Sequence, residues 1–225
     1  MSSSPAAAAT TAAKPSKRSF IEFVTQPAVD RIVAIIACVP FIWMTYYRYT
    51  HWPLGIPLLA FSTQTVVLLA TMIFRRAPKR LTPNPWFWAL AFFATYWAML
   101  TLVFMQPGRP LVPASVVNSL AMVGLIVMLW ARLSLGRNIG FVPAQREIVT
   151  VGAYRYLRHP IYAGLFITMF SVVLRAYSPR NVTLMGMHVA LMMIKSVVEE
   201  RFLSADPQYA AYLQKVKNRW IPFVL

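Results

Sequence analysis

The sequence predicts an all-α, polytopic transmembrane helical bundle, and three observations lead to that prediction. The 225 residues are 58% hydrophobic and 12% charged, and the mean hydropathy is +0.56. Those values exclude a disordered chain and point away from an ordinary soluble domain, while the length fits one membrane domain. Six apolar segments follow one another along the chain, and most of the 22 Lys and Arg residues lie in alternate connections between those segments or in the two terminal stretches.

Residues 1–19 are rich in Ala, Ser and Thr, and they carry Lys14, Lys17 and Arg18 but no acidic residue. Such a composition predicts a disordered N-terminal tail. A transit peptide is the alternative, because transit peptides also lack acidic residues. The apolar core of a secretory signal peptide is missing from this stretch.

The six apolar segments differ in length. Spanning the hydrocarbon takes about 20 helical residues, with a range of about 17–25. The second, third and fourth segments meet that length, whereas the fifth and sixth are short and are joined by residues 177–180. We therefore expect the last two to form a short hairpin. In chain order, the segments run over residues 32–47, 54–74, 86–105, 112–131, 161–174 and 182–198.

The distribution of charge sets the expected orientation. If the N-terminus is cytoplasmic and all six segments cross, all but four of the 22 basic residues lie on the cytoplasmic side; the exceptions are Arg48, Arg109, Arg175 and Arg180. The positive-inside rule predicts this asymmetry. It places both termini in the cytoplasm, and it accounts for the net charge of +16 through membrane lipids, without a nucleic-acid partner.

The stretch after the sixth segment is amphipathic. Tyr209, Tyr212, Val216 and Trp220 recur at helix-like spacing among basic residues, which predicts a C-terminal cytoplasmic helix that lies against the membrane or the bundle. The chain thus divides into three expected parts. They are a tail at 1–19, transmembrane helices one to four at 20–133, and a cofactor-binding region with the hairpin and the C-terminal helix at 134–225.

A polar loop at residues 136–159 opens directly into the fifth apolar segment. Pro160 suits the first turn of a helix, because its missing N–H would have no partner there. The N–H groups of that first turn face the loop, where they can bind a carboxylate or a ribose oxygen. Arg158 and His159 therefore lie at the start of the helix, and Tyr162 projects from its first turn.

Two carboxylates, Glu199 and Glu200, end the sixth segment. The C-terminal end of a helix carries partial negative charge, so these side chains need a cationic partner or a positively charged ligand. Lys195 lies four residues earlier on the face that Glu199 shares. Ionisable groups are costly in membranes and mark functional sites, so we expect the polar loop and the two glutamates to form two walls of one site. The single cysteine, Cys38, offers neither a disulfide nor a metal site.

These motifs resemble those of the isoprenylcysteine carboxyl methyltransferase family and of the related phospholipid N-methyltransferases. The resemblance covers about residues 130–225 and implies an integral membrane enzyme that binds S-adenosyl-L-methionine on the cytosolic side. The matching stretches are Leu-Arg-His-Pro-Ile-Tyr-Ala-Gly at 157–164, Glu199-Glu200, and the closing pattern Tyr209, Tyr212, Val216, Ile221-Pro222.

The resemblance also implies roles for single residues. Glu199 meets the positive end of the cofactor, and Lys195 takes the place of an arginine that lies near the substrate carboxylate in the prenylcysteine enzymes. Lysine keeps that charge but loses the bidentate geometry. The remaining cofactor-binding residues implied by the family are Ile148, Val149, Tyr154, His159, Pro160, Ile161 and Tyr162.

The chemistry of the acceptor leaves alternatives open. A carboxylate acceptor needs no base but needs a cation such as Arg158 or Lys195 to hold it, whereas an amine acceptor needs proton removal, for which Glu200 is the candidate. The first hypothesis is carboxyl O-methylation of isoprenylcysteine or a similar lipid-like acid that enters laterally from the bilayer. The second is N-methylation of an aminophospholipid, and a third is a non-catalytic membrane protein or a transporter.

Overall fold

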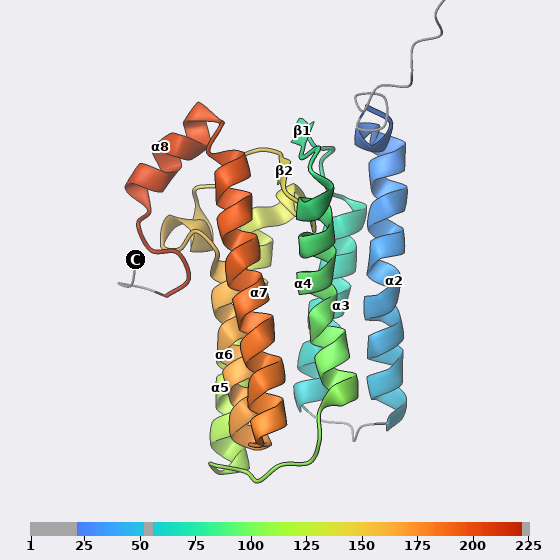
Figure 1. The fold of residues 1–225 in the computed structure, drawn as a ribbon, viewed down its shortest axis with the longest axis vertical. Helices are drawn as coiled ribbons and strands as arrows, with labels where there is room; N and C mark the ends of the chain where they lie inside the picture. Colours follow the sequence, from blue (N-terminus) through green and yellow to red (C-terminus); the bar gives the residue numbers. More distant parts are fainter. Residues whose placement is uncertain (1–21, 52–55, 222–225) are drawn as a thin grey trace, which may run out of the picture.

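The computed structural model describes residues 22–51 and 56–221, and it has the predicted all-α architecture (Figure 1). The tail expected at residues 1–19 lies outside the described residues. Each of the six apolar segments forms a helix, and a shorter helix follows them. The helices are α2 (Pro27–His51), α3 (Ile56–Ile73), α4 (Pro85–Phe104), α5 (Ala114–Leu135), α6 (Pro160–Arg175), α7 (Pro179–Leu203) and α8 (Pro207–Lys215).

Proline and a capping side chain start several of these helices. In α4, α7 and α8 the first residue is a proline, whose fixed φ suits that position. The preceding residue accepts a hydrogen bond from a backbone N–H of the first turn. The three capping residues are Asn84, Ser178 and Asp206, with bond lengths of 3.0, 3.1 and 2.7 Å. Local sequence therefore defines where these helices begin.

The sixth segment is longer than its apolar run predicts. Helix α7 has 25 residues, whereas α6 has 16. The cap at Ser178 starts α7 early, and Glu199 and Glu200 continue the helix because they find cationic partners there. Only the first arm of the expected hairpin is therefore short.

Three of the described helical stretches are long and apolar enough to cross a membrane: Pro27–His51, Ala114–Asn138 and Pro179–Leu203. Large apolar side chains on the outside of the bundle, such as Ile36, Val103 and Phe170, are about half or more exposed. In a soluble protein such exposure would be costly, whereas lipid accommodates it. The molecule is a membrane helical bundle, and the crossing of all six segments stays a prediction.

Helices α5 and α6 pack closely through two glycines. A Cβ atom added to Gly124 would lie 2.7 Å from the carbonyl oxygen of Gly164, and one added to Gly164 would lie 2.6 Å from the carbonyl oxygen of Gly124. Small residues at a helix crossing let two backbones approach in this way. At the far edge of the bundle from this pair, α2 packs on α3, and α4 packs on α7, which lies in front of α5 and α6 (Figure 1).

The polar loop between α5 and α6 contains short elements. The 3₁₀ turns Gly136–Asn138 and Gly152–Arg155 flank strand β2 (Ala144–Gln145), which pairs antiparallel with β1 (Arg80–Leu81) from the connection after α3. Gly152 has φ +60°, a left-handed conformation that favours glycine. The loop is thus fastened to the first half of the bundle.

The C-terminal helix is shorter than predicted. Helix α8 ends at Lys215, and Val216 is extended (φ −108°, ψ 103°). The expectation that Val216 and Trp220 lie on this helix is wrong. Residues 216–221, which we call the C-terminal strap, instead run back to the start of α6. The backbone N–H groups of Arg158 and His159 donate to the carbonyl oxygens of residues 218 and 219, both at 3.0 Å.

Candidate functional site

A cavity of about 290 Å³ lies between the polar loop and the helix bundle, and residues from each of α2 to α8 line it. Most of the wall surface is apolar, as is usual for small-molecule sites, but close to half of the lining residues are polar or charged. Of the residues predicted from the sequence to form the site, all but two line this cavity. The residues that do so are Ile148, Val149, Tyr154, Arg158, His159, Ile161, Tyr162, Lys195 and Glu199.

The two exceptions are Pro160 and Glu200. Pro160 is buried as the first residue of α6, where its role is to start the helix. Glu200 follows Glu199 directly, and neighbouring residues on a helix point about 100° apart. The side chain of Glu200 therefore faces the strap and not the cavity.

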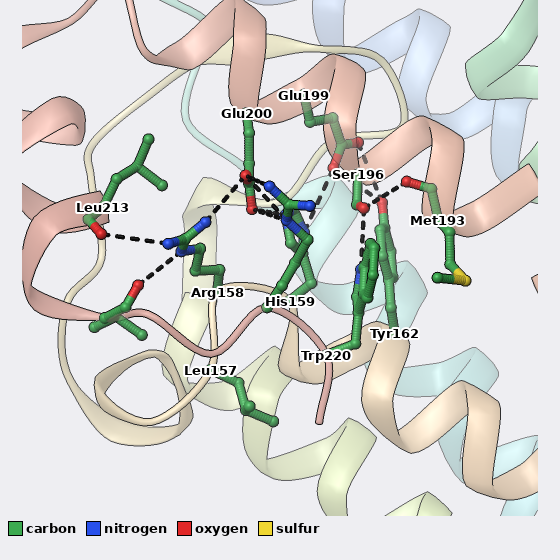
Figure 2. A network of polar contacts seen from close by, with 12 residues as sticks. Leu157, Arg158, His159, Tyr162, Met193, Ser196, Glu199, Glu200, Leu213 and Trp220 are labelled. Atoms are coloured by element: carbon green, nitrogen blue, oxygen red, sulfur yellow. Dashed lines mark hydrogen bonds and ion pairs between the residues drawn. The ribbon is translucent and has the colours of Figure 1, made fainter. Parts of the chain in front are cut away.

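The carboxylate of Glu199 is held at the wall of the cavity. The hydroxyl of Tyr162 donates to its two oxygens at 3.0 and 3.2 Å, as Figure 2 shows. The Nζ atom of Lys195 lies 3.8 Å away, and Nδ1 of His159 lies 4.0 Å away. The rings of His159 and Tyr162 stack, with centroids 5.2 Å apart and planes 12° apart. One turn of α7 and the first turn of α6 thus fix this acidic group.

Three side chains bind the carboxylate of Glu200: two residues just before α6 and one residue of the strap (Figure 2). Arg219 approaches to 2.8 Å, Nε2 of His159 to 3.0 Å and Nη1 of Arg158 to 3.3 Å. A carboxylate with this many donors is stabilised in its ionised form, so it is a poor proton acceptor. Glu200 joins the strap to the start of α6 and orients the ring of His159.

Arg158 makes two further contacts besides Glu200. Its Nε donates to the carbonyl oxygen of Val216 at 2.7 Å, and its Nη2 donates to that of Leu213 at 3.3 Å. The guanidinium therefore joins the residue stretch before α6 to α7, to the last turn of α8 and to the first residue after α8. It lines the cavity, but most of its donors are already engaged.

Lys195 is 4% exposed and lines the cavity. Its Nζ donates to Oγ1 of Thr95 on α4, at 3.0 Å, and lies 5.9 Å from the centre of the Tyr162 ring. Because Lys195 and Glu199 are one turn apart on α7, the sequence places them on one face. The partner on α4 is one hundred residues away, and no local pattern indicated it.

Other residues were not predicted to belong to the site. Arg219 is the shortest contact of Glu200, and Nε1 of Trp220 donates to Oγ of Ser196 at 3.0 Å. The signal that pointed toward Arg219 was general: two glutamates at a helix end need cations. That Arg219 is the partner of Glu200 depends on the path of the strap. The helical spacing of the C-terminal residues predicted a helix there instead.

The loop side of the cavity is anchored through Tyr154. Its carbonyl oxygen accepts a hydrogen bond from the hydroxyl of Tyr212 at 2.8 Å. Burial raises the pKa of both phenols well above 10, so both stay neutral at physiological pH. Gln145 donates to Asp206 at the cap of α8, which ties the loop to the C-terminal region. Among the described residues, no three His, Cys, Asp or Glu side chains form a group that could hold a metal ion.

Comparison with known proteins agrees with this geometry. The family model described as phospholipid methyltransferase matches residues 114–209, which run from the start of α5 into α8. That range contains the polar loop, the first turn of α6 and both glutamates. No curated protein matches the chain. The match supports a membrane methyltransferase that acts on lipid; the isoprenylcysteine carboxyl methyltransferase assignment stays a prediction.

Proposed function

We propose that the protein is an integral membrane methyltransferase that uses S-adenosyl-L-methionine and acts on a lipidic acceptor. The observation that carries the proposal is the position of Glu199. Its carboxylate lines the cavity, is fixed by Tyr162 and lies inside the range that the family model matches. A fixed carboxylate beside a mostly apolar cavity suits a ligand that combines a positive charge with an apolar body.

The residues of the cavity fit the two chemical ends of that cofactor. It supplies a methyl group on a positively charged sulfur, for which Glu199 is the complementary charge. Ile148, Val149 and the ring of Tyr154 offer an apolar surface for its base. His159 completes the wall between these groups, because Glu200 holds its ring in place.

Methyl transfer requires alignment of donor and acceptor more than it requires acid or base chemistry. The protein contributes by orienting both groups and by excluding water, which strengthens every charge interaction inside the cavity. The low exposure of Lys195, together with its partners Thr95 and Glu199, fixes a positive charge in that environment.

For the acceptor we favour a carboxylate, as in isoprenylcysteine or a similar lipid-like acid. A carboxylate needs a cation but no base, and Lys195 supplies the cation beside Glu199. Glu200, the base expected for an amine acceptor, does not line the cavity and is engaged by three donors. This arrangement supports O-methylation over N-methylation.

N-methylation of a phospholipid such as phosphatidylethanolamine is the second candidate, and the family match supports it. Proton removal would then fall to Glu199 or to His159, whose Nδ1 lies 4.0 Å from Glu199. In either case we propose that the acceptor enters the cavity laterally from the bilayer. We also propose that both termini of the chain lie in the cytoplasm.

The test combines the purified protein with methyl-labelled S-adenosyl-L-methionine and either a prenylcysteine analogue or phosphatidylethanolamine in vesicles. Label that mild alkali releases from the prenylcysteine indicates an ester and supports the first candidate. Label that stays on the phospholipid after alkali indicates N-methylation. Absence of cofactor binding by the wild-type protein would overturn the proposal. The same assay is run on Glu199→Gln. Its matched control is Glu22→Gln, at an exposed residue outside the cavity.

A further inference from the structure

Four cationic side chains line the cavity, and they differ in how their charge is balanced. For three of them a carboxylate lies within 4.0 Å. Those pairs are Arg146 with Asp30 at 3.7 Å, Arg158 with Glu200 at 3.3 Å and Lys195 with Glu199 at 3.8 Å. Arg132 is the exception: within the described part of the chain, it forms no ion pair.

Arg132 also lacks a hydrogen-bond partner where one is needed. Its Nε is buried, and no acceptor among the described residues reaches it. Met128 and Leu135 lie about one turn away on the same face of α5 and line the same cavity. The side chain of Arg132 is therefore part of the cavity wall.

The location makes an unbalanced guanidinium costly. Arg132 lies in the last turn of α5, inside an apolar stretch that can cross a membrane. The negative end of the helix favours a cation there, but this effect is far smaller than that of a direct carboxylate partner. Unpaired charges in such surroundings mark binding sites.

A second orphan atom lies in the same cavity. Nδ1 of His188 is buried without a hydrogen-bond partner, and the residue is 2% exposed. His188 is seven residues from Lys195, about two turns along the same face of α7, and both line the cavity. A ligand that is apolar throughout would leave both orphan atoms unsatisfied, so the cavity is suited to a ligand with polar groups.

We propose that Arg132 is the cation of an anion-binding subsite that takes a carboxylate or a phosphate of a ligand in the cavity. A guanidinium binds either group through two parallel hydrogen bonds. The anion-binding subsite is inferred from the structure, but the two sources of the anion that we consider depend on the proposed function. These are the carboxylate of S-adenosyl-L-methionine and the carboxylate or phosphate of the lipidic acceptor.

The experiment compares the wild-type protein with Arg132→Met and Arg132→Lys, and with Arg201→Gln as the matched control at an exposed arginine outside the cavity. The dissociation constants of S-adenosyl-L-methionine and of its decarboxylated form are measured for each. If the cofactor provides the anion, Arg132→Met weakens binding of the intact cofactor by about tenfold or more and leaves the decarboxylated form unchanged. Arg132→Lys recovers part of the loss.

If the acceptor provides the anion, cofactor binding is unchanged in Arg132→Met. The KM then rises by about tenfold or more for whichever acceptor is methylated, the prenylcysteine analogue or phosphatidylethanolamine. Unchanged values for both ligands would overturn the inference. So would an equal loss of affinity for the cofactor and its decarboxylated form. A purely structural role predicts a lower melting temperature for Arg132→Met. Our inference predicts an equal or higher one, because an unbalanced charge is removed.

A measurement without cofactor separates this inference from the proposed function. Inorganic phosphate should raise the melting temperature of the wild-type protein and of Arg201→Gln, but not that of Arg132→Met. If this holds while S-adenosyl-L-methionine fails to bind, the subsite stands and the proposed function falls. If the cofactor binds and Arg132→Met changes none of these measurements, the proposed function stands and the subsite falls.

Discussion

Glu199 and Glu200 are adjacent in the sequence but belong to two different regions of the molecule. Glu199 lines the cavity and has a phenol as its closest partner, with a lysine at 3.8 Å. Glu200 faces the strap and is bound by two arginines and a histidine. The difference shows how a helix separates two neighbouring carboxylates: Glu200 holds two segments of the chain together, and Glu199 lines the cavity.

The largest expected effect is on stability, from Glu200→Ala. This change leaves Arg158 and Arg219 without their carboxylate, and breaking a buried ion pair on one side costs about 3–5 kcal/mol. The melting temperature in detergent should fall markedly, and the strap should become sensitive to proteases. An unchanged melting temperature would show that the strap is held by other contacts.

Glu199→Gln should shift the balance from stability to activity. We expect a smaller fall in melting temperature than for Glu200→Ala, because only Lys195 loses its carboxylate and Thr95 still accepts a hydrogen bond from its Nζ. Methyl transfer should fall by about 100-fold, a loss comparable to that of one preorganised electrostatic contact. Cofactor affinity and labelled methyl transfer measure the effect, with Glu22→Gln as control. Equal effects of Glu199→Gln and Glu200→Ala on stability would erase the contrast between the two regions.

Tyr162→Phe tests how Glu199 is held. The change removes the hydroxyl that donates to both oxygens of Glu199 but keeps the ring stacked on His159. A hydrogen bond to a charged group contributes about 1.5–3 kcal/mol, so we expect about a tenfold or greater loss of transfer activity. Tyr46→Phe, at an exposed tyrosine, is the control. Full activity of Tyr162→Phe would show that Glu199 needs no such support.

Trp220→Phe should have the smallest effect and should concern the strap alone. The ring is largely retained, and the hydrogen bond from Nε1 to Ser196 is lost. The expected cost is about 1 kcal/mol of stability, visible as a small shift in melting temperature without loss of cofactor affinity. A large loss of affinity would instead place Trp220 in the cavity region.

The sequence predicted the helices well because their signals are local. Apolar runs lie within the helices that they predict. Ser178 and Pro179 are also local signals, but from the sequence alone they were assigned to the connection at 177–180, so the sixth segment was expected to begin at 182 whereas α7 begins at Pro179. The pairing of Lys195 with Glu199 followed from helical spacing in the same way. The 100° step of the helix separates Glu200 from Glu199, but from the sequence alone Glu200 was still the candidate base of the site, and its side chain does not line the cavity.

What the sequence could not predict depends on contacts between distant segments. Thr95 meets Lys195 across one hundred residues, and Arg219 reaches Glu200 because the chain leaves α8 at Val216. The helical spacing of Tyr212 and Val216 predicted that the helix would continue. Backbone hydrogen bonds to the start of α6 compete with that helix, and no local pattern encodes them.

The glycine contact between α5 and α6 has a mechanical consequence. Because the backbones at Gly124 and Gly164 approach closely, and the side chains of Met128 and Thr168 pack beside them, α5 and α6 have little space to move relative to each other at this crossing. If a lipid passes through the side of the bundle, the gate has to open at another seam. At the cavity, the hydrogen bond from Lys195 to Thr95 joins α7 to α4. If a lipid entered between these two helices, this hydrogen bond would have to break, and it involves a residue that lines the cavity.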